Sequence, residues 1–170
     1  EDGAFVNDVQ ETTRKSVLML AAERCDFGMA LMLLEAKATI DRRDLQGWAA
    51  VHHAVLSGNL ETVSALHNAS ADFSTATYEG NSLLFVAVKR DDASMVQLLL
   101  AIDPNRIDEL DMEGRTLLQV AAILGCASSV KALVVSGANV EVKGERNRSV
   151  LALAVRHPHV LEALFEESAS

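Results

Sequence analysis

The histidines are the side chains of this sequence best suited to acid–base or metal chemistry. His52 and His53 are adjacent, but the spacing pairs no Ser or Cys nucleophile with them, so a catalytic base is not indicated. His157 and His159 flank a proline and offer two metal ligands, but no third ligand is near them in the sequence. We therefore expect no catalytic residue and no bound metal ion.

The acidic residues also lack the spacing of a known site. Residues 108–111 (DELD) are expected in a solvated turn, because they lack the glycine and the 12-residue spacing of a calcium loop. Asp91 and Asp92 begin a turn between helices, where a carboxylate stabilises the N-terminus of a helix. The sequence contains no phosphate-binding loop, nucleotide fingerprint or zinc pattern. We predict that the protein is not an enzyme and binds no cofactor.

Length, composition and charge narrow the class of protein further. The 170 residues are 49% hydrophobic, which excludes a disordered chain, and are long enough for one domain. No apolar run approaches the roughly 18 residues of a membrane span, so we expect no insertion into a membrane. The net charge of −9 argues against a nucleic-acid partner, because phosphate contacts need a basic surface.

The elements that must position the functional side chains are repeated along the chain. One slot recurs at intervals of 33, 33, 34 and 33 residues, at Ser16, Ala49, Ser82, Thr116 and Ser149. Glycine recurs two residues before this slot, at Gly47, Gly80 and Gly114. Alanine recurs five residues after it, at Ala21, Ala54, Ala87, Ala121 and Ala154. A fixed period of this length is typical of a protein built from stacked repeats.

The period and the residues at the slot resemble the ankyrin repeat, whose motif is T-P-L-H-x-A. The five versions in this chain begin SVLM, AAVH, SLLF, TLLQ and SVLA, so none has the proline and only the second keeps the histidine, at His52. The resemblance covers residues 1 to about 166 and implies an all-α solenoid of stacked helix-turn-helix units with short hairpin loops. It also implies a structural role for His52, in a hydrogen bond between repeats.

The resemblance divides the chain into five repeats of a single domain, at about 11–43, 44–76, 77–110, 111–143 and 144–166. Residues 1–10 are interpreted as the end of a preceding repeat, and the chain as a fragment of a longer protein. The apolar spacing predicts helices at 16–24, 27–35, 49–56, 60–67, 82–89 and 94–101. Pro158 is expected in the inter-helix loop of a shortened repeat five, before a brief final helix that includes Val160 and Phe165.

Four further positions carry structural expectations. Lys37 replaces the usual glycine after the second helix of repeat one, where a left-handed backbone would be strained. Pro104 places the one inserted residue of repeat three in a loop. Cys25 and Cys126 fall in inter-helix loops roughly 30 Å apart by the number of stacked helices between them, beyond disulfide reach. Free thiols indicate a reducing, cytoplasmic location.

The recurring small and aliphatic residues of each first helix are expected in the core, where small side chains let adjacent helices approach. They are Leu18, Ala21, Val51, Ala54, Leu84, Ala87, Leu118, Ala121, Leu151 and Ala154.

Candidate binding residues are those that the fold does not need. The family resemblance implies that partners bind a concave side, formed by the hairpin tips and the exposed face of each first helix. The candidates on that side are Leu45, Trp48, Leu56, Tyr78, Asn81, Lys89, Arg90, Met112, Arg115, Ile123, Leu124 and Arg148. Their apolar members would form a strip across repeats two to four, and exposed apolar strips usually mark interaction sites. The whole side carries eight basic residues against four acidic ones.

The resulting hypothesis is a monomeric, non-enzymatic adaptor module that captures a short peptide with acidic and apolar residues. Trp48 and Tyr78 would anchor apolar groups, while Lys89, Arg90, Arg115 and Arg148 would pair with carboxylates. Two other classes stay open: a structural spacer that packs against other parts of the same protein, and a regulatory segment of a membrane protein or enzyme. At the residue level, Trp48 could instead fold back over its turn, and Leu56, Ile123 and Leu124 could contact neighbouring helices.

Overall fold

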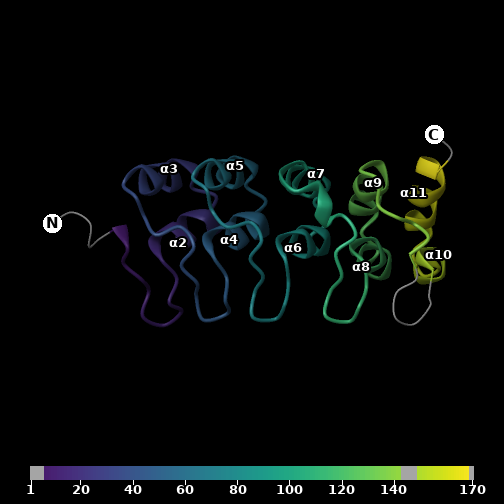
Figure 1. Cartoon of the computed structure of the whole chain (residues 1–170), viewed down its shortest axis with the longest axis horizontal. Coiled ribbons are helices and arrows are strands. Elements are labelled where there is room, and N and C mark those ends of the chain that lie inside the picture. The colour runs from purple at the N-terminus through teal and green to yellow at the C-terminus, as the bar shows by residue number, and fades with distance from the viewer. Residues whose placement is uncertain (1–5, 143–148, 169–170) are drawn as a thin grey trace. The chain divides into compact units, whose positions relative to one another are not determined.

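The computed structural model describes residues 6–142 and 149–168, which form pairs of helices joined by hairpin loops (Figure 1). The chain divides into two compact units, with the boundary between Leu83 and Leu84. The described residues contain no β-strand, only isolated bridges between Val9 and Ser16, Ala76 and Ser82, and Leu110 and Thr116. These bridges close the bases of three hairpins. The predicted all-α architecture of helix-turn-helix units is confirmed.

The first unit contains two helix pairs. α2 (Val17–Glu23) and α3 (Phe27–Glu35) form one pair, and α4 (Ala50–Ser57) and α5 (Leu60–Asn68) form the other. We call the first helix of a pair the inner helix and the second the outer helix. α2 packs against α4 and α3 packs against α5, so this unit has an inner and an outer layer (Figure 1).

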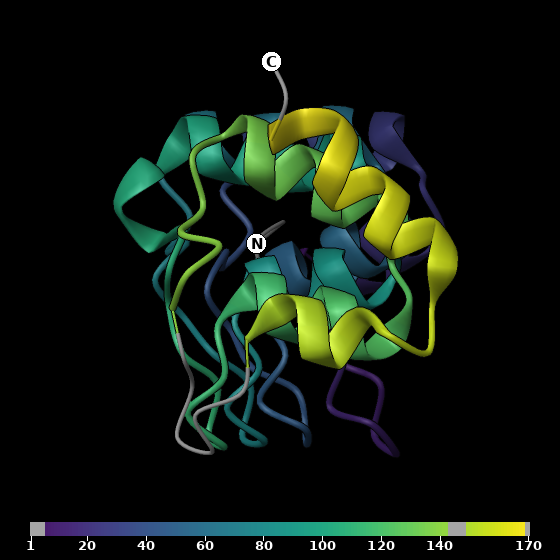
Figure 2. The ribbon, with the colours of Figure 1, turned by 90° about the vertical axis from the view of Figure 1, so that its right-hand side faces the viewer.

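The second unit contains three pairs. They are α6 (Leu83–Lys89) with α7 (Ala93–Ile102), α8 (Leu117–Leu124) with α9 (Ala127–Val135), and α10 (Val150–Ala154) with α11 (Pro158–Ser168). Inner helices α8 and α10 are in contact, and outer helix α9 contacts both α7 and α11. The hairpin that precedes α8 extends away from the inner layer on the side opposite the outer helices (Figure 2).

Hydroxyl, carboxylate and carboxamide caps explain why helices begin at these residues. Ser16, Thr116 and Ser149 stand at the N-caps of inner helices, and each side-chain oxygen accepts a hydrogen bond from the backbone N–H three residues later. Outer helices α3, α5 and α7 are capped in the same way by Asp26, Asn59 and Asp92. Such caps are each worth about 1 kcal/mol. The slot that defines the sequence period is therefore largely a helix start.

Left-handed backbone positions end the helices. Gly58 and Gly125 follow inner helices with φ of 78° and 80°. Cys25 and Asp91 fill the same position in repeats one and three, with φ of 56° and 55°. Lys37 has a φ of 60°, which confirms the strained left-handed residue expected at this position.

The N3 position of the inner helices, three residues after the N-cap, shows how a degraded motif keeps its role. His52 Nδ1 accepts a hydrogen bond from the backbone N–H of Ala49 at 3.1 Å. In repeat four, Gln119 Oε1 accepts the equivalent bond from Thr116 at 3.1 Å, and Gln119 Nε2 donates to the carbonyl of Val142 at 3.1 Å. A carboxamide therefore replaces the imidazole at this position. Both side chains are buried.

Most predicted helix bounds are right to within one residue, but repeat five differs from the sequence prediction. Pro158 is the first residue of α11 and not part of the inter-helix loop. The first position of a helix tolerates proline because no backbone N–H is needed there. α11 has 11 residues and is the longest described helix, so the expected brief final helix is wrong, whereas α10 is short, with five residues. Pro104 begins a 3-10 helix, η1 (Pro104–Arg106), in the loop after α7.

The core consists of the recurring aliphatic and alanine residues. Of the ten residues expected there, nine are buried. The exception is Leu151, which is 41% exposed on α10 and was wrongly placed in the core. No helix in the described part of the chain is both long and apolar enough to cross a membrane.

Candidate functional site

The clearest common feature of the predicted site residues is one repeated hairpin position. Leu45, Tyr78 and Met112 each lie two residues before a hairpin glycine with positive φ, Gly47, Gly80 and Gly114 respectively. Tyr78 is 69% exposed and Met112 is 80% exposed, and they are the two most exposed large apolar side chains that the structure describes. The turn itself needs only the glycine, so these side chains are available for contact.

In the first unit, Tyr78 is held in place by the neighbouring hairpin. Its backbone N–H donates to the carbonyl of Gln46 at 3.1 Å. Its ring lies so close to Gly47 that a Cβ on that residue would be 2.6 Å from the Tyr78 Cδ1 atom. The ring is thus exposed on one side and supported on the other, the arrangement of an anchor with little rotamer entropy to lose. Asn81 is half-buried and its side-chain amide donates to Glu79.

Trp48 is half-buried rather than freely exposed. Its ring centroid lies 5.8 Å from that of His52 and 5.4 Å from that of His53. Leu56 lies near the C-terminal end of α4, the inner helix that follows Trp48, and is exposed. Trp48 therefore folds back in part, as the alternative interpretation expected. The Trp48 ring packs against the two histidines, and only the remaining part of the ring is accessible to a partner.

A buried polar cluster lies beneath Trp48. Asp44 Oδ2 is 2.9 Å from His53 Nε2, and Asp44 Oδ1 accepts backbone hydrogen bonds from Gln46 and Trp48. Burial lowers the pKa of His53, and the hydrogen bond that its ring donates to the Asp44 carboxylate opposes this effect. Burial also lowers the pKa of His52 to about 4, with the nearby Arg43 adding to the shift. Both histidines therefore favour the neutral form, and the cluster fixes the hairpin geometry.

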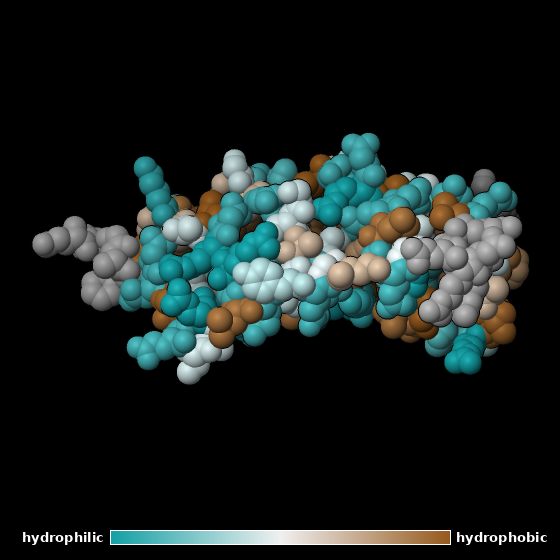
Figure 3. Space-filling view, turned by 60° about the horizontal axis from the view of Figure 1, so that its bottom comes forward, coloured by the Kyte–Doolittle hydropathy of each residue, from teal (hydrophilic) through white to brown (hydrophobic). Residues whose placement is uncertain are grey.

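In the second unit, the candidate apolar residues are divided between a hairpin and an inner helix. Met112 lies on the hairpin, while Ile123 and Leu124 end α8 and are exposed. Lys89 and Arg90 are exposed at the end of α6. On the side viewed in Figure 3, apolar side chains occur in separate patches between hydrophilic ones. This distribution favours individual anchors over one broad apolar surface.

The predicted basic character of this side is reduced by pairing within the chain. Arg115 Nη2 lies 2.6 Å from Asp111 Oδ2, and Arg115 Nη1 lies 2.8 Å from Glu113 Oε2. Lys15 is similarly paired with Glu23 at 2.8 Å. Arg115 stabilises its own hairpin and would have to leave two carboxylates to bind a third. Arg148 lies outside the described residues.

Sequence inspection missed one exposed residue of this side. Leu110 is exposed at the base of the hairpin that carries Met112. The equivalent position holds Arg43 in repeat two and Ala76 in repeat three. A long apolar side chain at this otherwise variable position is the sequence signal that could have identified it.

The histidine pair of repeat five has a structural role. His157 Nε2 lies 3.1 Å from the carbonyl oxygen of Ile123, and His159 Nε2 lies 2.9 Å from that of Gly125. His157, in the last inter-helix turn, and His159, in the first turn of α11, therefore both contact the end of α8. Among residues 6–142 and 149–168, no group of three or more His, Cys, Asp or Glu side chains is placed to hold a metal ion.

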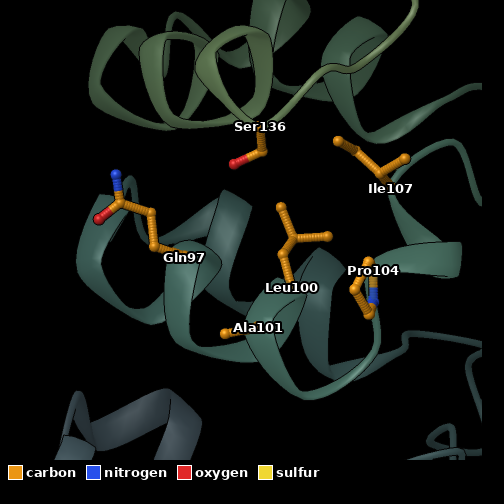
Figure 4. Close-up of a pocket in the computed structure, with 6 residues that line it drawn as sticks. All are labelled: Gln97, Leu100, Ala101, Pro104, Ile107 and Ser136. Atoms are coloured by element: carbon orange, nitrogen blue, oxygen red, sulfur yellow. The ribbon is translucent and has the colours of Figure 1, made fainter.

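The cysteines and the cavity offer little chemistry. Both thiols are free, and burial raises the pKa of Cys126, which disfavours the reactive thiolate. A shallow pocket of about 260 Å³ lies between α7, η1 and the end of α9, and it is lined by Gln97, Leu100, Ala101, Pro104, Ile107 and Ser136 (Figure 4). Its volume is below the roughly 300–1,000 Å³ of typical small-molecule sites.

These features define a helical repeat protein with exposed apolar residues on its hairpins. The chain belongs to the ankyrin repeat family, because the family model for ankyrin repeats matches it in three copies, at residues 3–77, 54–144 and 84–170. Ankyrin repeats generally mediate protein–protein interaction, and the family is a non-enzymatic interaction module.

Curated relatives are similar over most of this chain. It is 27% identical over 155 residues to human neurogenic locus notch homolog protein 1, covering 89% of this chain and 6% of that protein. It is 32% identical over 128 residues to the mouse nuclear factor NF-kappa-B p105 subunit, covering 73% of this chain and 13% of that protein. The chicken p105 subunit is 27% identical over 144 residues, covering 83% of this chain and 15% of that protein. The chain thus spans a small part of these relatives.

Proposed function

We propose that this chain is a protein-interaction module that presents apolar anchors to a partner from its hairpins and the ends of its inner helices. The observation that carries the proposal is the hairpin position shared by Leu45, Tyr78 and Met112. Three successive hairpins hold an exposed apolar side chain there, although the turn requires only the following glycine. Anchors on rigid, preformed hairpins would leave most of the ordering entropy to the partner.

The partner segment that fits is a short peptide with apolar and acidic residues. Apolar groups would contact Tyr78, Met112 and the exposed part of Trp48. Lys89 and Arg90, both exposed at the end of α6, would contact its carboxylates. Arg115 is paired with Asp111 and Glu113 and would have to leave them to do so. We further propose an adaptor role inside the cell, which the two free cysteines favour.

A photo-crosslinking experiment tests this function. A photoreactive phenylalanine analogue is placed at Met112 or Tyr78 and, as a matched control, at Val135. Val135 is 64% exposed but belongs to the outer helix α9. Irradiation in cells should give the same discrete crosslinked protein from positions 112 and 78, and none from position 135.

Side-chain removal separates binding from folding in the same system. Met112→Ser should abolish retention of the crosslinked partner, whereas Val135→Ser should leave it intact, with equal helicity in both variants. Crosslinks that form equally at all three positions, or a partner retained by Met112→Ser, would show that the hairpin surface is not the binding site. In that case the spacer hypothesis, in which the chain packs against other parts of the same protein, becomes the better one.

A further inference from the structure

The second unit repeats one pair of positions at or just beyond the C-terminal end of each inner helix. The pair begins two residues after the recurring alanine of the motif, at Ala87, Ala121 and Ala154. Five of the six residues at these positions are exposed and the sixth is half-buried, so the fold does not use their side chains as core. We call them the turn row: Lys89, Arg90, Ile123, Leu124, Arg156 and His157.

Side chains of the inter-helix turns hold the three pairs at fixed positions. Asp91, in the turn after α6, accepts the backbone N–H of Ser129 in the first turn of α9 at 2.7 Å. His157 Nε2, in the turn after α10, lies 3.1 Å from the carbonyl oxygen of Ile123 near the end of α8. Each turn is thus hydrogen-bonded to the next repeat or the previous one, and α6, α8 and α10 follow one another in the inner layer (Figure 1). The turn row is therefore preformed.

The charge of the turn row is opposite in sign to that of the chain. Three of its six residues are basic and none is acidic, whereas the whole chain has a net charge of −9. The nearest carboxylates in sequence, Asp91 and Asp92, accept backbone N–H groups at the starts of α9 and α7. The equivalent positions of the first unit hold one acidic and one basic residue among Glu23, Arg24, Leu56 and Ser57. A preference for an acidic ligand is therefore a property of the second unit.

The first position of each pair gives the turn row a symmetrical pattern. Lys89 and Arg156 are basic, and Ile123 between them is aliphatic. Ile123 is 36% exposed and the next residue, Leu124, is 49% exposed, so the middle of the turn row is apolar. Cations on both sides of an apolar contact favour a ligand with complementary charges in the same order. That ligand has an acidic, an apolar and a second acidic side chain on one face.

The distance between inner helices selects the conformation of such a ligand. Packed helices lie about 8–10 Å apart, so equivalent positions of successive repeats are separated by about that distance. A polyproline II helix rises about 9.3 Å in each turn of three residues, which places every third side chain on one face. In a β-strand, side chains on one face are two residues and about 6.7 Å apart, so a strand would not stay in register with the turn row.

We propose that the turn row binds a polyproline II peptide whose apolar residue has an acidic residue three positions before it and another three positions after it. The carboxylates would contact Lys89 and Arg156, and the apolar residue would pack on Ile123 and Leu124. Because the pattern is symmetrical, it fits the turn row in either direction of the peptide. The peptide is the partner segment of the proposed function, on which this inference therefore rests.

Two synthetic peptides of identical composition test the pattern with the 170-residue chain. One has the core EPPLPPE, and the other has the core PEPLPEP, in which the acids lie two residues from the leucine. Proline holds both peptides in the polyproline II conformation. In an NMR titration, EPPLPPE should shift the backbone amide resonances near the C-terminal ends of α6, α8 and α10. It should also bind at least about fivefold more tightly than PEPLPEP, the effect expected from exposed ion pairs.

Charge reversal in the chain and in the peptide separates recognition from folding. Arg156→Glu should weaken binding of EPPLPPE, and replacing one glutamate of the peptide by lysine, to give EPPLPPK, should restore it. Lys131→Glu is the matched control, because it changes the net charge equally at an exposed position of the outer helix α9. This control variant should bind EPPLPPE as tightly as the wild-type chain.

Equal binding of the two peptides, no binding of either, no rescue by EPPLPPK, or amide shifts confined to α9 would overturn the proposal. The cations would then only complement the C-terminal ends of the inner helices, where basic side chains interact favourably with the helix dipole. Met112→Ser tests the hairpin anchors separately, through the partner captured in cells. A partner that requires Met112 but is retained by Arg156→Glu would leave the proposed function standing and overturn only the peptide pattern.

Discussion

At the residue scale, one position of the inner helix accepts different side chains because its task is a hydrogen bond and not a charge. His52 and Gln119 each accept the N–H of their own N-cap residue, at 3.1 Å in both repeats. Met19 fills the same position in repeat one, with its sulfur 3.3 Å from the Ser16 nitrogen. An acceptor suffices at this position, so a histidine there gains nothing from protonation.

The lowered pKa of His52 makes the folded state sensitive to acid. The pKa lies at about 4 in the folded chain, against an ordinary value of 6.5. Between these values the unfolded chain binds a proton that the folded chain excludes. His52 therefore destabilises the fold progressively as pH falls from 6.5 to about 4, by at most about 3.5 kcal/mol at about 1.4 kcal/mol per pKa unit.

His52→Gln should remove this dependence, because Gln119 shows that a carboxamide makes the same hydrogen bond. Urea unfolding at several pH values should give a difference between variant and wild type that moves in favour of the variant below pH 6.5. His53 and the carboxylates are present in both proteins, so their contributions to the pH dependence of the free energy of unfolding cancel in the difference. Parallel stability curves for the two proteins would contradict the assigned role of His52.

At the element scale, helix α9 begins without a cap of its own. Its N-cap residue, Cys126, makes no side-chain hydrogen bond to the helix. Instead Asp91, from the preceding inter-helix turn, accepts the N–H of Ser129 at 2.7 Å and that of Ser128 at 3.3 Å. A carboxylate at a helix N-terminus also interacts favourably with the helix dipole. Repeat four thus depends on a residue of repeat three for its outer helix.

Asp91→Gly tests this cap without adding backbone strain, since the φ of 55° suits glycine. We expect a loss of about 1 kcal/mol or slightly more in the free energy of unfolding. Cys126→Asn should restore most of that loss in the Asp91→Gly background, because Asn59 caps α5 from the same position. In the wild-type background Cys126→Asn should add little. Equal effects of Cys126→Asn in both backgrounds would contradict the shared cap.

The sequence predicted most elements because their signals are local. The recurring Ser and Thr mark helix starts, and their hydrogen bonds are formed within three residues. The errors arise where neighbouring elements decide. Leu151 has the motif of a core residue, but its exposure depends on which helices surround it. Pro158 begins a helix because α10 is short, with five residues, and the first position of the next helix tolerates proline.

The candidate site was predictable as a set of positions but not as a set of roles. The exposure of Leu45, Tyr78 and Met112 follows from the hairpin glycines, which the sequence shows. The pairing of Arg115 with Asp111 was also visible in principle, as opposite charges four residues apart across a tight turn. The contact of the Trp48 ring with two histidines depends on side-chain packing that no spacing encodes.

At the scale of the whole molecule, the stability of stacked repeats is approximately a sum over single repeats and their contacts with neighbours. Within the second unit, α9 packs against α7 on one side and α11 on the other, whereas the last outer helix, α11, packs against α9 and α10. In the first unit, α2 packs against α3 and α4, and α3 packs against α2 and α5. Terminal pairs should therefore open more easily than the pair formed by α8 and α9.

Amide hydrogen exchange of the isolated chain should show faster exchange in α2, α3 and α10 than in α8 and α9. Helices α8 and α9 serve as the internal reference, because α9 packs against outer helices on both of its sides. Exchange in α2 and α3 as slow as in α8 and α9 would mean that the two pairs of the first unit are stable without further neighbours, and would contradict the dependence of repeat stability on neighbouring repeats.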